Sequence, residues 1–157
     1  MFLQDVYKPE FIKVGLEAED KDDVFEELAD QFCQASKINA REEILAAIRE
    51  REAKMSTGIR QGIAIPHGKT NAVDAVYGVL GVSKRGIDYD ALDGKPVYLL
   101  FLILAPEKDT ENYLRLLKRA AELLDNPLFY TDLVAQNSAQ EAYNILKKYE
   151  DILIALD

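Results

Sequence analysis

The stretch from Ser56 to Gly68, with the sequence STGIRQGIAIPHG, surrounds the only histidine of this 157-residue chain. Its three glycines and one proline exclude a regular helix. The apolar run Ile63–Ile65 predicts a short buried strand, and Pro66 ends that strand because proline lacks a backbone N–H. His67 then lies at the end of a strand. In open α/β sheets, functional sites gather at the carboxyl ends of strands.

Helical patterns precede this stretch. Apolar residues spaced four apart predict a helix over Lys21–Ala35, with Asp20 as its N-cap. A second helix is expected to begin at Asn39, where Asn39 and Glu42 resemble a capping box, and to end at about Arg51 or Glu52.

Strands and further helices follow. The segments Ala75–Ser83 and Val97–Ala105 predict strands, and the second is apolar enough to be covered on both faces. A helix over Thr110–Leu124 is expected, then a short one from Pro127 and a last one capped by Ser138 and Glu141. The expected buried face of the first of these carries four residues: Leu114, Leu117, Ala121 and Leu124. The apolar tail, residues 151–157, is expected to dock on the body of the protein rather than on another subunit. This order predicts a single α/β domain over residues 1–157, with helices flanking the strands.

Charge and composition restrict the partners. A formal net charge of −9 argues against nucleic acid and anionic membrane surfaces and favours a basic protein partner. The longest apolar run, Leu99–Ala105, is far shorter than the ~20 residues of a membrane helix. One cysteine, Cys33, excludes an internal disulfide, and the acidic start of the chain does not resemble a signal peptide. We therefore expect a cytoplasmic protein with no direct membrane insertion.

His67 is the candidate for chemistry. A lone histidine is more often structural, but its place between Pro66 and Gly68 at a strand end favours function. Phosphoryl transfer to an imidazole requires an unprotonated nitrogen and compensation of the phosphoryl charge, with little other chemistry. Taken alone, either arginine near His67 is most simply a solvated surface charge. The candidates to face a phosphoryl group are Arg51, Arg60, the hydroxyl of Thr57, and the N–H groups of Gly68 and Lys69.

Other chemistries fit less well. Gly68, Lys69 and Thr70 form the end of a phosphate-binding loop motif, but Ile63 stands where that motif needs glycine, and Pro66 removes an N–H. One histidine and one cysteine do not make a usual zinc site. No serine-nucleophile elbow is present. Neither a metal nor another cofactor is expected.

The stretch STGIRQGIAIPHGK resembles the signature of enzyme IIA domains of the fructose–mannitol type, from the bacterial phosphoenolpyruvate-dependent sugar phosphotransferase system, including their nitrogen-regulatory relatives. The similarity extends to the Arg51-Glu52 pair, to ALDGKPVYLLFLILAP and to the closing helices. It implies a mixed sheet flanked by helices. It also implies that the small basic carrier HPr phosphorylates Nε2 of His67, that Arg51 approaches the phosphohistidine, and that a IIB domain receives the phosphoryl group.

Two positions depart from the family pattern. Arg60 replaces a glycine, so it is either strained or a second charge that faces the phosphoryl group. Tyr113 stands where the family has a second histidine, and it can bind a phosphoryl oxygen but cannot carry a positive charge near pH 7. We therefore predict a phosphotransferase component, a phosphohistidine carrier that serves a IIB partner or a regulatory target. The alternative is a non-catalytic module that retains the IIA fold and binds proteins.

Overall fold

The computed structural model describes residues 1–156, which fold into two helical layers around one mixed sheet. The helices of this part are α1 (Leu3–Val6), the 3-10 helix η1 (Pro9–Phe11), α2 (Lys21–Ser36), α3 (Arg41–Glu52), α4 (Thr110–Leu124), α5 (Pro127–Val134) and α6 (Ala139–Leu156). The strands are β1 (Ile12–Val14), β2 (Ile63–Ala64), β3 (His67–Lys69), β4 (Tyr77–Ile87) and β5 (Val97–Ala105). No helix of residues 1–156 has both the length and the apolar character needed to cross a bilayer. The predicted α/β class with a mixed sheet is confirmed.

The long hairpin of β4 and β5 forms the centre of the sheet. These two strands are antiparallel; β1 lies parallel to β4, and both β2 and β3 lie parallel to β5. β2 and β3 follow one another along the same edge of β5, because Ile63 pairs with Leu99 and His67 with Ile103. His67 is thus the first residue of a strand, whereas the sequence placed it after one.

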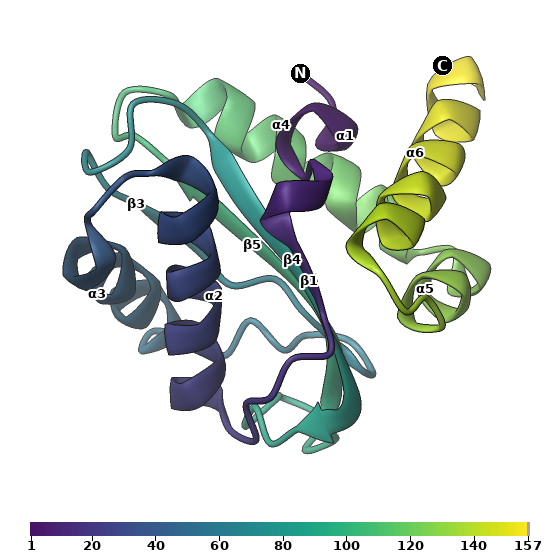
Figure 1. Cartoon of the computed structure of the whole chain (residues 1–157), viewed down its shortest axis with the longest axis horizontal. Helices are drawn as coiled ribbons and strands as arrows, with labels where there is room; N and C mark the ends of the chain where they lie inside the picture. The colour runs from purple at the N-terminus through teal and green to yellow at the C-terminus, as the bar shows by residue number, and fades with distance from the viewer. Residues whose placement is uncertain (157) are drawn as a thin grey trace.

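Two hydrophobic cores lie on opposite faces of the sheet. Alternate residues of β5 enter each core: Leu99, Phe101 and Ile103 pack toward α4, α5 and α6, while Leu100 and Leu102 pack toward α2 and α3. Figure 1 shows these two helical groups on the two sides of the sheet. The prediction that Val97–Ala105 is covered on both faces is confirmed.

The helices α2, α4 and α5 form close to the predicted positions. Asp20 caps α2 by accepting from the N–H of Asp23, and α4 has the predicted bounds. In α5, Pro127 occupies the first turn and the Asn126 side chain accepts from the N–H of Leu128. These local signals sufficed because each cap is made within three residues of its partner.

The predicted start of α3 was wrong. Ala40 occupies the N-cap position without a side-chain bond. The carboxylate of Glu42, expected to complete a capping box, instead accepts from Arg41, whose guanidinium also pairs with Glu26 and Asp30 on α2. The ion pair with Arg41 therefore takes the Glu42 carboxylate that a capping box would need.

The predicted buried face of α4 was displaced by one residue at three of its four positions, whereas Leu124 is buried as predicted. Leu114 is 56% exposed, whereas its neighbour Tyr113 is 8% exposed. The buried side chains of this helix are Tyr113, Leu116, Ala120, Leu123 and Leu124. Two adjacent apolar stripes run along α4, so periodicity alone could not choose between them. The stripe that carries the aromatic ring is the one that packs against the sheet.

The two ends of the described chain meet. The buried carboxylate of Glu150 in α6 accepts from the N–H groups of Leu3 and Gln4, at 2.7 and 3.0 Å, and so holds α1. Ser138 accepts from the N–H of Glu141 at the start of α6, as the sequence predicted. The apolar tail is only partly covered: Leu153 packs against the core, whereas Leu156 is exposed, and Asp157 lies outside the described residues.

Candidate functional site

A break in the edge strand shapes the surroundings of His67. Between β2 and β3, Pro66 provides no N–H, and its carbonyl accepts from Ile103 of β5. Two residues before His67, the carbonyl oxygen of Ile65 lies 2.8 Å from the imidazole Nδ1. A carbonyl oxygen can only accept, so Nδ1 carries the proton and donates. The lone pair of the neutral ring is therefore on Nε2.

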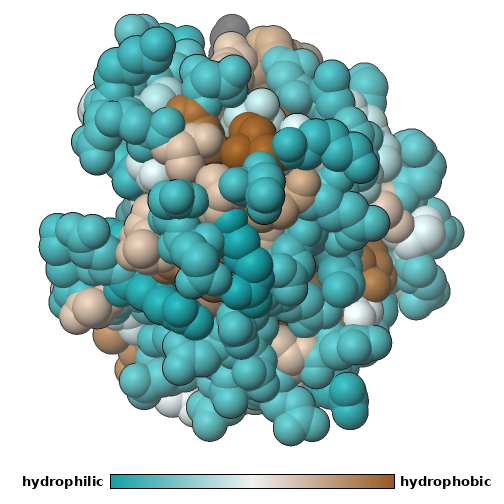
Figure 2. Space-filling view, turned by 60° about the vertical axis from the view of Figure 1, so that its left-hand side comes forward, coloured by the Kyte–Doolittle hydropathy of each residue, from teal (hydrophilic) through white to brown (hydrophobic). Residues whose placement is uncertain are grey.

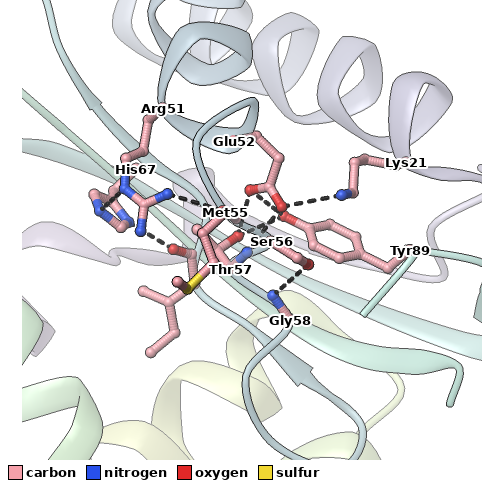
Figure 3. Close-up of polar contacts among 10 residues, drawn as sticks. Lys21, Arg51, Glu52, Met55, Ser56, Thr57, Gly58, His67 and Tyr89 are labelled. Atoms are coloured by element: carbon pink, nitrogen blue, oxygen red, sulfur yellow. Dashed lines mark hydrogen bonds and ion pairs between the residues drawn. The ribbon is translucent and has the colours of Figure 1, made fainter. Parts of the chain in front are cut away.

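Arg51, in the last turn of α3, approaches that second nitrogen. Its Nε–H donates to Nε2 of His67 at 3.1 Å, and its Nη1 donates to the carbonyl oxygen of Met55 at 2.9 Å (Figure 3). A guanidinium has no acceptor atom, so Nε2 must accept. Both imidazole nitrogens thus specify the same tautomer, with Nδ1 protonated.

Gly68 brings α3 close enough for this contact. A Cβ placed on Gly68 would lie 2.9 Å from the carbonyl oxygen of Ala47 and 3.2 Å from its Cβ. Ala47 and Arg51 are one helical turn apart and share a face of α3. The missing side chain at Gly68 therefore lets α3 pack directly on β3, with Arg51 above His67.

The half-buried His67 is neutral at pH 7. Burial is the largest effect and lowers its pKa from the ordinary value, and the positive charge of Arg51 lowers it further. The hydrogen bond to Ile65 and the negative charge of Glu52 oppose this shift. The net direction is downward, so the unprotonated ring predominates.

Tyr113 packs beside the imidazole. The two ring centroids are 5.8 Å apart, and burial raises the pKa of Tyr113 to about 12. Its hydroxyl is therefore neutral. The ammonium group of Lys69 lies 5.4 Å from the centre of the Tyr113 ring and donates to Thr110 Oγ1 at 2.6 Å. The ammonium group of Lys69, the last residue of β3, is thus held next to Tyr113.

A cleft of about 260 Å³ opens beside these groups. Its cationic lining consists of Arg51, Lys54 and Lys69. Glu50 and Glu107 contribute carboxylates to the same walls. Among residues 1–156, no group of three or more His, Cys, Asp or Glu side chains is arranged to hold a metal ion. The arrangement can place a neutral imidazole nitrogen next to cations, which suits a transferable anionic group.

Residues 5–149 match the family described as phosphoenolpyruvate-dependent sugar phosphotransferase system, EIIA 2. The chain belongs to this EIIA family. It is 36% identical over 139 residues to the fructose-specific EIIABC component of Bacillus subtilis, a match that covers 88% of the chain but only 22% of that longer protein. It is 34% identical to a nitrogen regulatory protein of Bradyrhizobium diazoefficiens, covering 93% of the chain and 95% of the relative.

A solved structure of an EIIA relative has the same fold. The nitrogen regulatory protein IIA-Ntr from Neisseria meningitidis superimposes with a TM-score of 0.84 at 29% identity, over 92% of this chain and 98% of that one. The family predicted from residues 56–69 is therefore confirmed, as is its fold.

Two residues predicted to face a phosphoryl group have other partners in this EIIA chain. Thr57 is buried, and its hydroxyl contacts Glu52 and Tyr89 instead of His67. Arg60 forms an ion pair with Asp125 at the end of α4. Arg60 is also unstrained, because the positive φ of this loop falls on Gly62.

The backbone of β3 separates the two predicted N–H donors. Pro66 and Thr70 both form hydrogen bonds with β5, and alternate residues of a strand turn their backbone groups to the same side. The N–H of Gly68 therefore faces β5, while that of Lys69 turns away from the sheet. Gly68 contributes close packing, and Lys69 brings an outward-facing N–H and a cation near the cleft.

The sequence did not assign a role to Glu52. Its carboxylate, with the side chain 5% exposed, lies at the centre of a network that also contains Lys21, Thr57 and Tyr89 (Figure 3). The helical spacing could have indicated that Glu52 is buried, because it lies one turn after Ile48 on the buried face of α3. A buried carboxylate needs hydrogen-bond donors.

Proposed function

We propose that His67 takes a phosphoryl group from HPr onto Nε2 and passes it to a IIB protein or uses it as a regulatory signal. The observation that carries this proposal is the hydrogen bond of Nδ1–H to the Ile65 carbonyl, which leaves the Nε2 lone pair at the surface of the neutral ring. The lowered pKa of His67 keeps that lone pair unprotonated at pH 7.

The transfer exchanges one bond to phosphorus for another. The Nε2 lone pair forms a bond to phosphorus while the bond between phosphorus and HPr breaks, and the Nδ1 proton stays in its bond to Ile65. Arg51 must first leave Nε2, because one lone pair cannot both accept its N–H and attack phosphorus. The bond from Arg51 to the Met55 carbonyl keeps the guanidinium nearby, where it can then donate to the phosphoryl oxygens.

Three further groups would face the phosphoryl oxygens. The ammonium and the outward-facing N–H of Lys69 supply a charge and a donor, and the neutral Tyr113 hydroxyl supplies a second donor. The backbone of Gly68 allows the approach of α3 and makes no such contact itself.

Partners would dock around the cleft. Four large apolar side chains exposed by more than half border the segments that carry the site: Met55, Ile59, Leu92 and Leu114. Figure 2 turns the side with α3 and β3 forward and shows a mostly hydrophilic face with small, separate apolar groups. Such small groups within an acidic protein of net charge −9 suit transient docking of a basic carrier.

The relatives support both forms of the carrier function. The name of the Bacillus protein joins A, B and C components, which supports a IIB acceptor. The Bradyrhizobium protein is named for nitrogen regulation and matches over 95% of its length, which supports a regulatory target. Both forms require a phosphorylated His67, and we expect the protein to act in the cytoplasm.

The test is phosphorylation of the purified protein with phosphoenolpyruvate, enzyme I and HPr. We expect a phosphate that is labile to acid and stable to base, with a ³¹P signal of Nε2-phosphohistidine, and none on His67→Gln. An unlabelled wild-type protein with cognate HPr would exclude the carrier function. If a partner nevertheless bound, the non-catalytic binding module would be the correct hypothesis.

A further inference from the structure

The proposed transfer gives no role to the buried carboxylate of Glu52. Glu52 ends α3, directly after Arg51, and its side chain is 5% exposed. It contacts four donors: the N–H and hydroxyl of Thr57 at 2.8 and 2.6 Å, the Tyr89 hydroxyl at 3.2 Å and the Lys21 ammonium at 3.1 Å. A buried charge with this many donors is held in one position.

These contacts anchor the loop that follows α3. Thr57 is attached to the carboxylate through both its backbone and its side chain, and its hydroxyl also contacts Tyr89 at 2.7 Å. Tyr89 belongs to the connection between β4 and β5 and is fully buried, with its ring nearly perpendicular to that of Phe25. The loop is therefore attached to the body of the protein two residues after Met55.

Met55 links this anchor to the histidine. Its carbonyl oxygen accepts from Nη1 of Arg51, while Nε of the same guanidinium donates to His67. A planar guanidinium presents these two N–H groups in fixed relative directions. The position of the Met55 carbonyl therefore determines whether Nε–H points at Nε2. Figure 3 shows two groups of contacts, those of Glu52 with Lys21, Thr57 and Tyr89 and those of Arg51 with Met55 and His67; the backbone from Met55 to Thr57 joins them.

We propose that Glu52 is a positioning residue: through Thr57 it fixes the Met55 carbonyl, and so it keeps the Arg51 guanidinium beside Nε2 of His67, where that guanidinium can donate to the phosphoryl oxygens once it has left Nε2. Tyr89 and Lys21 act through Glu52 by fixing its carboxylate. The kinetic consequence rests on the proposed phosphocarrier function, whereas the effect on the geometry of His67 does not.

The groups that face His67 decide which variants are informative. These are Arg51 from α3, Tyr113 from α4 and, through space, the charge of Glu52. Replacing Glu52 both removes a charge that raises the pKa of His67 and releases Arg51, which lowers it, so the two effects oppose each other. Tyr89→Phe removes a hydroxyl and Thr57→Val replaces one with a methyl group, while both keep the carboxylate, so they isolate the positioning effect.

The experiment uses the fact that the chain has one histidine, whose imidazole signals are unambiguous in NMR. For Tyr89→Phe and Thr57→Val we expect the pKa of His67 to rise toward its ordinary value and the hydrogen-bonded Arg51 Nε–H signal to be lost. Thr57→Ser should restore both. The matched control is Tyr7→Phe, which removes the buried hydroxyl bond to Leu102 on the sheet, away from this network. It should change neither signal.

A rate measurement extends the test to function. Phosphorylation by HPr should slow by about 10- to 100-fold in Tyr89→Phe and Thr57→Val, the effect of misplacing a catalytic group by about 1 Å. Glu52→Gln should also lose the Arg51 Nε–H signal. Its control is Glu27→Gln, which should keep that signal, because the Glu27 carboxylate accepts from the backbone N–H groups of Glu17 and Ala18.

Two results separate the possible failures. If folded Tyr89→Phe and Thr57→Val keep the wild-type pKa of His67 and the Arg51 signal, Glu52 does not position Arg51 and the proposal is wrong. If both signals change as expected but the wild-type protein accepts no phosphoryl group, the positioning role stands and the phosphocarrier function fails. Should Glu52→Gln not fold, the two hydroxyl variants still decide the question.

Discussion

Gly68→Ala tests whether close packing of β3 on α3 sets the contact between Arg51 and His67. The added Cβ would lie 2.9 Å from the Ala47 carbonyl oxygen and 3.0 Å from its carbonyl carbon. Both are backbone atoms, so no side chain can rotate away. The helix and the strand must separate by about 0.5 Å before the first contact reaches the ordinary 3.4 Å.

The expected effects follow from that displacement. Overpacking of this kind costs about 1–3 kcal/mol of unfolding free energy. For a domain of this size, each kcal/mol lowers Tm by about 2–4 °C. A separation of about 0.5 Å also lengthens the 3.1 Å contact from Arg51 to Nε2 of His67 beyond hydrogen-bond distance. Loss of that nearby positive charge raises the pKa of His67.

Thermal unfolding and an NMR titration of the histidine measure the two effects. Gly15→Ala is the control: Gly15 has a φ of +83° and no atom within 4 Å of the added Cβ, so it loses stability through backbone strain alone. Its His67 pKa should stay at the wild-type value. A Gly68→Ala protein with wild-type Tm and wild-type His67 pKa would refute the packing argument. A lower Tm with an unchanged pKa would show that Arg51 keeps its contact with His67 even when α3 and β3 have separated.

Three other perturbations have definite expected outcomes. Tyr113→His should speed transfer to a IIB acceptor by about 10-fold or more, because a protonated imidazole adds a charge next to the phosphoryl group; an unchanged rate in a quench-flow assay would contradict this. Arg60→Ala should cost less than about 1 kcal/mol, since its pair with Asp125 is exposed, and should leave the rate of phosphorylation unchanged. Acidification below pH ~6.5, the ordinary histidine pKa, should destabilise the wild type more than His67→Gln. The folded protein binds that proton less readily than the unfolded chain, because its His67 pKa is lowered. Urea midpoints at pH 7.5 and 5.5 compare the two proteins.

Local patterns predicted most of the fold. The bounds of α4 and the burial of β5 on both faces followed from periodicity and caps that involve residues close in sequence. The face of α4 did not, because the choice between Tyr113 and Leu114 depends on what the helix packs against. The extension of β4 to Ile87 was also missed, since Lys84 and Arg85 are exposed and interrupt the apolar pattern.

The candidate site also contains residues that could be predicted from local sequence and residues that could not. His67 could be found from its immediate neighbours, because Ile65, Pro66 and Gly68 define its hydrogen bond and its access. The partners of Thr57 and Arg60 could not be predicted from their neighbours, because Asp125 lies 65 residues after Arg60 and Tyr89 lies 32 residues after Thr57. A polar side chain in a glycine-rich loop takes whichever strong partner the fold brings within reach.

Glu52 shows how much further sequence reasoning can go. Its spacing from Ile48 places a carboxylate on the core-facing side of α3, and such a group must find donors or lose its charge. That requirement is enough to predict a buried network next to Arg51. It does not predict that Thr57 and Tyr89 supply the donors, because that depends on how two loops meet. The histidine proposed to carry the phosphoryl group is therefore recognisable from its neighbours, whereas the carboxylate proposed to position Arg51 is recognisable only as a buried charge in need of partners.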